Sequence, residues 1–142
     1  MGDLGINYQA NVWQAHELEG VFVSEFFGLY NDKENAPEII FLKFENEMWI
    51  RVFLDDFLGY LYQTEEQVVE EIIENDFAGF QKVDLVPLLD GEPLVLRSVA
   101  CVKGPAPTVE FRINNLLLTY LYIQSGGKSM LKVEGSGKNL TK

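Results

Sequence analysis

The sequence predicts an α+β fold, in which a strongly curved and mostly antiparallel sheet of about seven to nine strands packs against one amphipathic helix. Runs rich in β-branched and aromatic residues recur along the chain, and the short turns between them join antiparallel neighbours. Only residues 64–77 show apolar side chains at clear helical spacing. A closed β-barrel carrying one helix is the alternative architecture.

The size and composition of the chain favour one domain with its own core. Its 142 residues are 47% hydrophobic and 13% aromatic, which is enough for a core that needs no disulfide or metal. We expect residues 1–134 to form a single globular domain, followed by a mobile polar tail over residues 135–142.

The first half of the chain contains four expected strands, over residues 20–30, 38–44, 48–54 and 57–62. Residues 1–18 show only a brief pattern, which resembles one face of a short helix. The polar link Glu45-Asn46-Glu47 favours a hairpin between the second and third strands. Side chains of the third strand alternate between two largely apolar faces, which is typical of a central strand. Met48, Ile50, Val52 and Leu54 share one face, and Trp49, Arg51 and Phe53 share the other.

The helix over residues 64–77 is predicted from its start signal and its apolar stripe. Thr64 and Gln67 have the spacing of a capping box, in which two side chains satisfy free backbone amides. The stripe consists of Val68, Val69, Ile72, Ile73 and Phe77.

The second half of the chain is again strand-like. Residues 83–89 and 94–102 flank Asp90-Gly91, a turn pair that favours a hairpin between them. Strands are also expected over residues 109–113 and 130–134. Residues 116–123 fit either a strand or a short buried helix, and their branched and tyrosine side chains favour the strand.

The charge balance favours some classes of partner over others. The chain has 22 acidic and 11 basic residues, for a net charge of −11. This balance disfavours nucleic acid and anionic membranes, and it favours basic proteins. The first twenty residues lack the basic start and apolar block of a signal peptide, and no apolar run is long enough to span a membrane. We therefore expect a cytoplasmic protein.

The outer face of the predicted helix is unusually acidic. It carries Glu66, Glu70, Glu71 and Glu74, with no Lys or Arg between Gln63 and Gln81. Like charges four residues apart cost about 0.2–0.5 kcal/mol per pair. One interpretation is that the face binds a partner, and the other is that it only keeps the protein soluble.

Catalytic and metal-binding residues are scarce. The single histidine, His16, and the single cysteine, Cys101, are too few for an ordinary zinc site, and Cys101 lies in an apolar run. We therefore expect no cofactor and no metal. The adjacent carboxylates Asp55 and Asp56 could serve an enzyme with Arg51 or Arg97 as an anion clamp, but a polar strand end is the favoured explanation for them.

Three functional hypotheses follow. The first is a non-enzymatic acidic protein that binds and masks a basic protein partner, as immunity proteins and inhibitors do, through Glu66, Glu70, Glu71, Glu74, Asp55 and Asp56. The alternative is a small-molecule-binding protein with an aromatic-lined cavity in a cupped sheet or barrel, lined by Tyr60, Tyr62, Tyr120 and Tyr122. The third, an enzyme built on Asp55 or Asp56, is the least favoured. A homodimer formed through a sheet edge is compatible with each of them.

Overall fold

The computed structural model describes residues 5–31, 37–55, 57–89, 91–104, 106–123 and 128–135, with the side chains of residues 122, 123, 128, 129 and 135 outside the description. Within these residues, eleven strands form one sheet in which all pairs are antiparallel. The strands are β1 (Asn7–Ala10), β2 (Trp13–Gln14), β3 (Val21–Tyr30), β4 (Pro37–Phe44), β5 (Trp49–Leu54), β6 (Gly59–Thr64), β7 (Gln81–Asp84), β8 (Leu94–Val102), β9 (Thr108–Ile113), β10 (Leu116–Ile123) and β11 (Lys128–Gly135). The helical segments are η1 (His16–Leu18), α1 (Glu66–Glu71), η2 (Ile72–Asp76) and η3 (Val86–Leu88).

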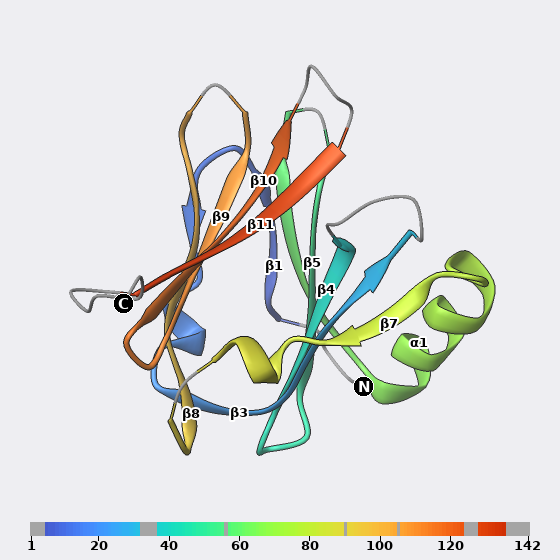
Figure 1. Cartoon of the computed structure of the whole chain (residues 1–142), viewed down its shortest axis with the longest axis horizontal. Coiled ribbons are helices and arrows are strands. Elements are labelled where there is room, and N and C mark those ends of the chain that lie inside the picture. The colour runs from blue at the N-terminus through green and yellow to red at the C-terminus, as the bar shows by residue number, and fades with distance from the viewer. Residues whose placement is uncertain are drawn as a thin grey trace.

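The strand order is β1-β6-β5-β4-β3-β8-β9-β10-β11, with β2 added to β8 and β7 added to β3. The sheet curves until its two halves face each other, with β9 to β11 on one side of Figure 1 and β4 to β6 on the other. In the described part of the chain β1 and β11 end this order without pairing with each other, so the sheet is open. The curved antiparallel sheet with one helix is therefore confirmed, and the closed barrel is not favoured.

Strand β3 is the point at which the sheet divides. Its first residues, Val21–Val23, pair with β8, whereas Phe27–Tyr30 pair with β7. Between these two stretches, the backbone amide of Leu85 donates a hydrogen bond of 2.8 Å to the carbonyl of Phe26. The short turn η3 then leads from β7 toward β8, and Figure 1 shows it to the left of β7.

This division explains why the predicted hairpin of residues 83–89 with residues 94–102 is wrong. Strand β7 covers residues 81–84 and pairs with β3 instead of β8. The chain then enters η3, where Pro87 has no amide to donate to a ladder. Asp90, half of the predicted turn, lies outside the described residues.

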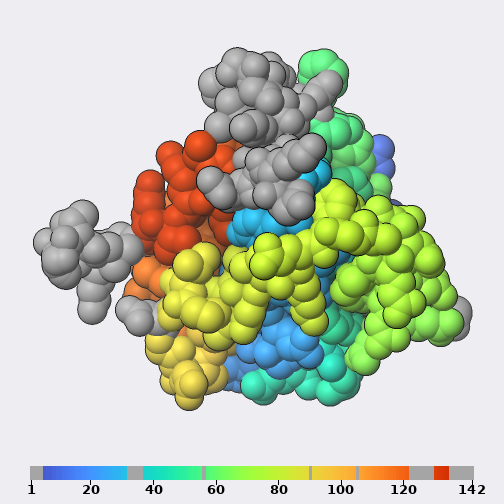
Figure 2. Space-filling model, turned by 45° about the vertical axis from the view of Figure 1, so that its right-hand side comes forward, coloured from blue at the N-terminus to red at the C-terminus, as the bar shows by residue number. Residues whose placement is uncertain are grey.

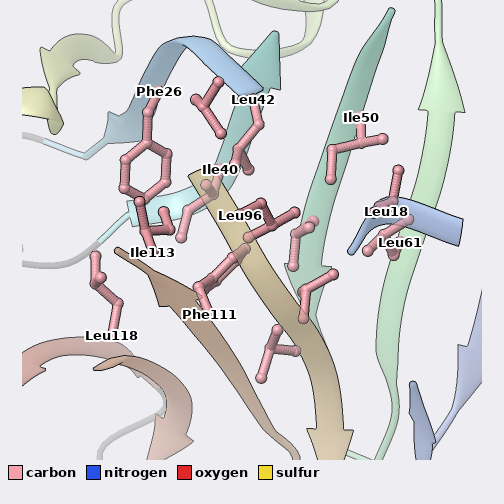
Figure 3. Close-up of a cluster of buried hydrophobic side chains, with 14 of the residues drawn as sticks. Leu18, Phe26, Ile40, Leu42, Ile50, Leu61, Leu96, Phe111, Ile113 and Leu118 are labelled. Atoms are coloured by element: carbon pink, nitrogen blue, oxygen red, sulfur yellow. The ribbon is translucent and has the colours of Figure 1, made fainter. Parts of the chain in front are cut away.

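The concave face of the sheet carries the main core. Its side chains come from both halves of the curved sheet and point toward one another in Figure 3. The fully buried ones include Phe26, Ile40, Ile50, Leu96, Phe111 and Leu118. Tyr120 also belongs to this core, and its hydroxyl donates a hydrogen bond of 3.0 Å to the carbonyl of Pro37. That bond joins β10 to β4, two strands that are not neighbours in the sheet.

The convex face carries a second, smaller core beneath the helix. Phe27, Phe41 and Trp49 from three neighbouring strands pack against Val69 and Ile72 of the helix. The apolar stripe of residues 64–77 is thus buried as predicted. The helix itself begins at Glu66, passes from α1 into η2 at Ile72 and ends at Asp76. Among the described residues, no helix has the length and apolar character needed to cross a membrane.

Two local predictions are wrong, one for the cap of the helix and one for the first residues of the chain. Thr64 does not cap the helix, because it pairs with Trp49 as the last residue of β6, and Glu65 takes the N-cap position without a side-chain bond. Residues 5–18 contain β1, β2 and the three-residue η1 instead of a short helix over Tyr8 to Ala15. The indole of Trp13 donates a hydrogen bond of 3.0 Å to the carbonyl of Gly59, which ties this segment to the sheet. These short strands raise the number of strands in the described sheet to eleven, beyond the expected seven to nine.

The remaining strand predictions are confirmed with small shifts at their ends. Residues 20–30, 38–44, 48–54 and 57–62 correspond to β3, β4, β5 and β6. Residues 94–102, 109–113, 116–123 and 130–134 correspond to β8 to β11, and residues 116–123 form a strand and not a helix. The predicted tail from 136 onward lies outside the described residues, and Gly135 ends β11.

Candidate functional site

The convex surface, which we define as the outer face of β4 to β6 together with the helix of residues 66–76, carries most of the predicted site residues. All four glutamates of the predicted acidic face, Glu66, Glu70, Glu71 and Glu74, are exposed. Figure 2 shows the helix as the green segment that projects from the side of the molecule, with its outer surface uncovered. The second core holds the helix from below, so these carboxylates project from an anchored support.

Lys43 of β4 compensates part of this acidic face. Its ammonium group lies 3.2 Å from a carboxylate oxygen of Glu47, 3.4 Å from one of Glu66 and 3.9 Å from one of Glu25. The hydrogen bond to Glu47 contributes most to raising the pKa of Lys43 above its ordinary value. A basic residue from β4 therefore reaches the start of the helix, although the helix itself contains no Lys or Arg.

The outer part of the helix keeps its negative charge. Glu71 accepts a long hydrogen bond of 3.5 Å from the amide of Gln67, which carries no charge. No ion pair within the described residues involves Glu70 or Glu74. The uncompensated part of the acidic face therefore consists of Glu70, Glu71 and Glu74.

Asp55 belongs to the turn between β5 and β6. One carboxylate oxygen accepts hydrogen bonds of 2.9 Å from the backbone amides of Phe57 and Leu58. The other accepts a hydrogen bond of 2.7 Å from the hydroxyl of Tyr60. Partial burial opposes ionisation of this carboxyl, but the three hydrogen bonds together hold its pKa below the ordinary value. Its neighbour Asp56 lies outside the described residues.

Replacing Asp55 by Asn should make the stability of the protein less sensitive to acid. Because the pKa of Asp55 is lower in the folded state, its carboxylate stabilises the fold above its unfolded pKa of about 3.9. That contribution is lost as the pH falls through the folded pKa. The free energy of unfolding, measured with urea at pH 7 and pH 3, should therefore fall less in Asp55→Asn than in the native chain. An equal fall in both proteins would contradict this role.

The predicted tyrosines do not lie on one face of the sheet. Tyr60 and Tyr62 of β6 are on the convex surface, where Phe53 stacks on Tyr60 with ring centres 4.6 Å apart. Tyr120 is fully buried in the concave core. The side chain of Tyr122 lies outside the description. The structure therefore does not bring Tyr60 and Tyr62 together with Tyr120 around one cavity.

A groove that sequence analysis did not anticipate lies between β5 and the end of the helix. It has a volume of about 370 Å³. Its lining residues are Glu38, Ile39, Arg51, Phe53, Leu54, Ile72, Asp76 and Phe77. They come from β4, β5 and the end of the helix, which are separated in the sequence, so no local motif could have shown the groove. The only signal was the position of Arg51 on an otherwise aromatic strand face.

Arg51 is the cation of this groove. Its guanidinium carbon lies 5.3 Å from the ring centre of Tyr62, a cation–π contact. The hydroxyl of Tyr62 donates a hydrogen bond of 2.9 Å to the side-chain oxygen of Gln9 in β1. The Nε atom of Arg51 is buried and has no hydrogen-bond partner within the described structure. Arg97, the other candidate anion clamp, is exposed on β8.

Two further hollows border the division of β3. One of about 820 Å³ is lined by residues that include Ser24, Glu45 and Glu92, and the other of about 360 Å³ by residues that include Glu25, Lys82 and Asp84. The hydroxyl of Ser24 donates to the carbonyl of Lys43 at 3.2 Å, so it is part of the backbone network. Neither hollow contains a histidine or cysteine that could act as a nucleophile or base.

The residues suited to nucleophilic catalysis lie elsewhere. Cys101 is buried, and this burial raises the pKa of its thiol, which keeps it protonated at neutral pH. His16 is exposed, and its Nδ1 atom lies 3.1 Å from a carboxylate oxygen of Glu19. In the described part of the chain, no three His, Cys, Asp or Glu side chains are placed to hold a metal ion together.

Comparison with known proteins gives no match, whether to a protein-family model, to a curated protein or to a solved structure.

Proposed function

We propose that this protein is a non-enzymatic acidic interaction protein that binds and masks a basic protein partner in the cytoplasm. The observation that carries the proposal is the uncompensated acidic face. Glu70, Glu71 and Glu74 project from a helix that a separate core anchors, and no ion pair within the described residues neutralises Glu70 or Glu74. The excess of acidic residues, for a net charge of −11, adds a long-range attraction for basic surfaces.

The physical role of this face is to guide and orient the partner. Exposed ion pairs contribute only about 0.2–1 kcal/mol each, so charge alone does not make a tight complex. Complementary charge does raise the rate of association and disfavour acidic competitors. The aromatic side chains beside the helix, Phe53, Tyr60 and Tyr62, supply the type of contact that strengthens protein interfaces. The bulk of the bound acidic protein would then cover the partner's own functional site, as in immunity proteins and inhibitors.

Charge reversal on the helix tests this proposal. The variant Glu70→Lys/Glu74→Lys should lose a basic partner that the native protein retains in a pull-down from the lysate of its host. We expect an affinity loss of about tenfold or more, because each substitution replaces attraction with repulsion. Complex formation should also weaken between low and high salt, since salt screens exposed charges.

A matched control separates a specific face from overall charge. Glu92→Lys/Glu134→Lys makes the same change in net charge at two exposed positions of the loop before β8 and of β11. This control should retain the partner. If the helix variant retains the partner as well, the acidic face is not the binding surface. If both variants lose it equally, the attraction is that of a non-specific polyanion.

A further inference from the structure

The groove between β5 and the end of the helix contains an arginine, Arg51, that forms no ion pair with a carboxylate of the described residues. The described residues include many carboxylates, and Lys43 alone contacts three of them. Arg51, by contrast, forms no ion pair among these residues, and its buried Nε has no acceptor. The Nε atom is enclosed by protein and out of reach of a ligand, so its missing acceptor does not itself point to one. The guanidinium lines the groove without a carboxylate partner among the described residues, and it therefore suits a ligand that brings its own carboxylate.

The position of this guanidinium is restrained before any ligand arrives. It packs against the ring of Tyr62, whose hydroxyl is held by Gln9. Phe53, from the same strand face, packs with Tyr60 and Tyr62 and lines the groove. A planar guanidinium supported in this way can bind a carboxylate through two parallel hydrogen bonds.

The rest of the lining defines what else the ligand must carry. Asp76 also lines the groove, so an ammonium group would be attracted there. Phe53, Ile72 and Phe77 provide an apolar wall for a hydrophobic body. The volume of about 370 Å³ lies at the lower end of the range for small-molecule sites and is too small for a docked helix.

We propose that this groove is a binding site for a small zwitterion with an apolar body, of the class of free α-amino acids with an aromatic or large aliphatic side chain. Arg51 binds the carboxylate, Asp76 attracts the ammonium group, and the side chain lies against Phe53 and Phe77. The site goes beyond the proposed function, because it neither uses Glu70 or Glu74 nor requires a protein partner.

Three related probes test the proposal on the native protein. L-Phenylalanine carries both charges, 3-phenylpropanoate lacks the ammonium group, and 2-phenylethylamine lacks the carboxylate. In an NMR titration, L-phenylalanine should shift the signals of Phe53, Ile72 and Phe77 with saturation, and each one-charge analogue should bind at least about fivefold more weakly. The proposal is overturned if L-phenylalanine gives no saturable shift at tens of millimolar, or if either analogue binds as tightly.

Variants then assign the charges to residues. Arg51→Gln should weaken binding of L-phenylalanine by about tenfold or more, whereas Arg97→Gln, on an exposed part of β8, should leave it unchanged. Equal affinities for these two variants would overturn the role of Arg51. The probe series on the native chain needs no variant, so a misfolded Arg51→Gln would still leave the proposal testable. Glu70→Lys/Glu74→Lys should bind L-phenylalanine normally, which keeps a failure here distinct from a failure of the partner proposal.

Discussion

Replacing Phe111 by Ala is expected to lower the free energy of unfolding by about 3–5 kcal/mol. Phe111 of β9 is fully buried in the concave core. Its ring centre lies 6.0 Å from that of Phe26, which belongs to β3. Removing the ring forfeits its apolar burial and leaves a cavity between the two halves of the sheet, which neighbouring strands can close only in part. Urea unfolding followed by circular dichroism measures the change.

Phe57→Ala is the matched control for this substitution. Phe57 is 72% exposed in the turn between β5 and β6, so its removal should change the stability by no more than about 0.5 kcal/mol. A loss below about 1 kcal/mol for Phe111→Ala would contradict the packed core. It would indicate a hollow interior instead, and would favour the hypothesis that the cupped sheet encloses a small molecule.

The periodicity of single segments was enough to predict which side chains share a face of a strand or helix. In β5 the alternation of two apolar sets was visible, and the structure places Ile50 in the concave core and Trp49 in the convex one. The partner of β7 could not be predicted in this way. Pairing of Val83 with Gly28 joins residues far apart in the chain, and it depends on how β3 divides between two neighbours. The turn residues Asp90-Gly91 had instead indicated that residues 83–89 pair with residues 94–102.

The candidate site was predictable to the same extent. Helical spacing correctly indicated that Glu70 and Glu74 are exposed, because the opposite face carries the apolar stripe. It could not show that Lys43 approaches Glu66, since that contact joins a strand to a helix 23 positions later. Sequence reasoning also singled out Arg51, but grouped it with Asp55. The structure shows Asp55 engaged in its own turn and places Arg51 at the groove.

Substitution of Val69 by Asp should detach the helix from the sheet. Val69 is 2% exposed in the convex core, which is distinct from the concave core. An unpaired carboxylate there loses its hydration without gaining a partner, and we expect a loss of roughly 3 kcal/mol or more at pH 7. Hydrogen exchange should show loss of protection over residues 66–76, while the amides of β8 to β10 stay protected.

The pH dependence identifies the cause of this loss. Burial raises the folded-state pKa of the introduced carboxyl above its unfolded value of about 3.9, so the cost of charging it grows as the pH rises above that value. Relative to the native protein, Val69→Asp should therefore be less destabilised at pH 4 than at pH 7. Val69→Asn, which has a similar shape and no charge, should show the same loss at both pH values. If the helix face binds the basic partner, Val69→Asp must also abolish that binding, and a variant that still binds would place the interface on another surface.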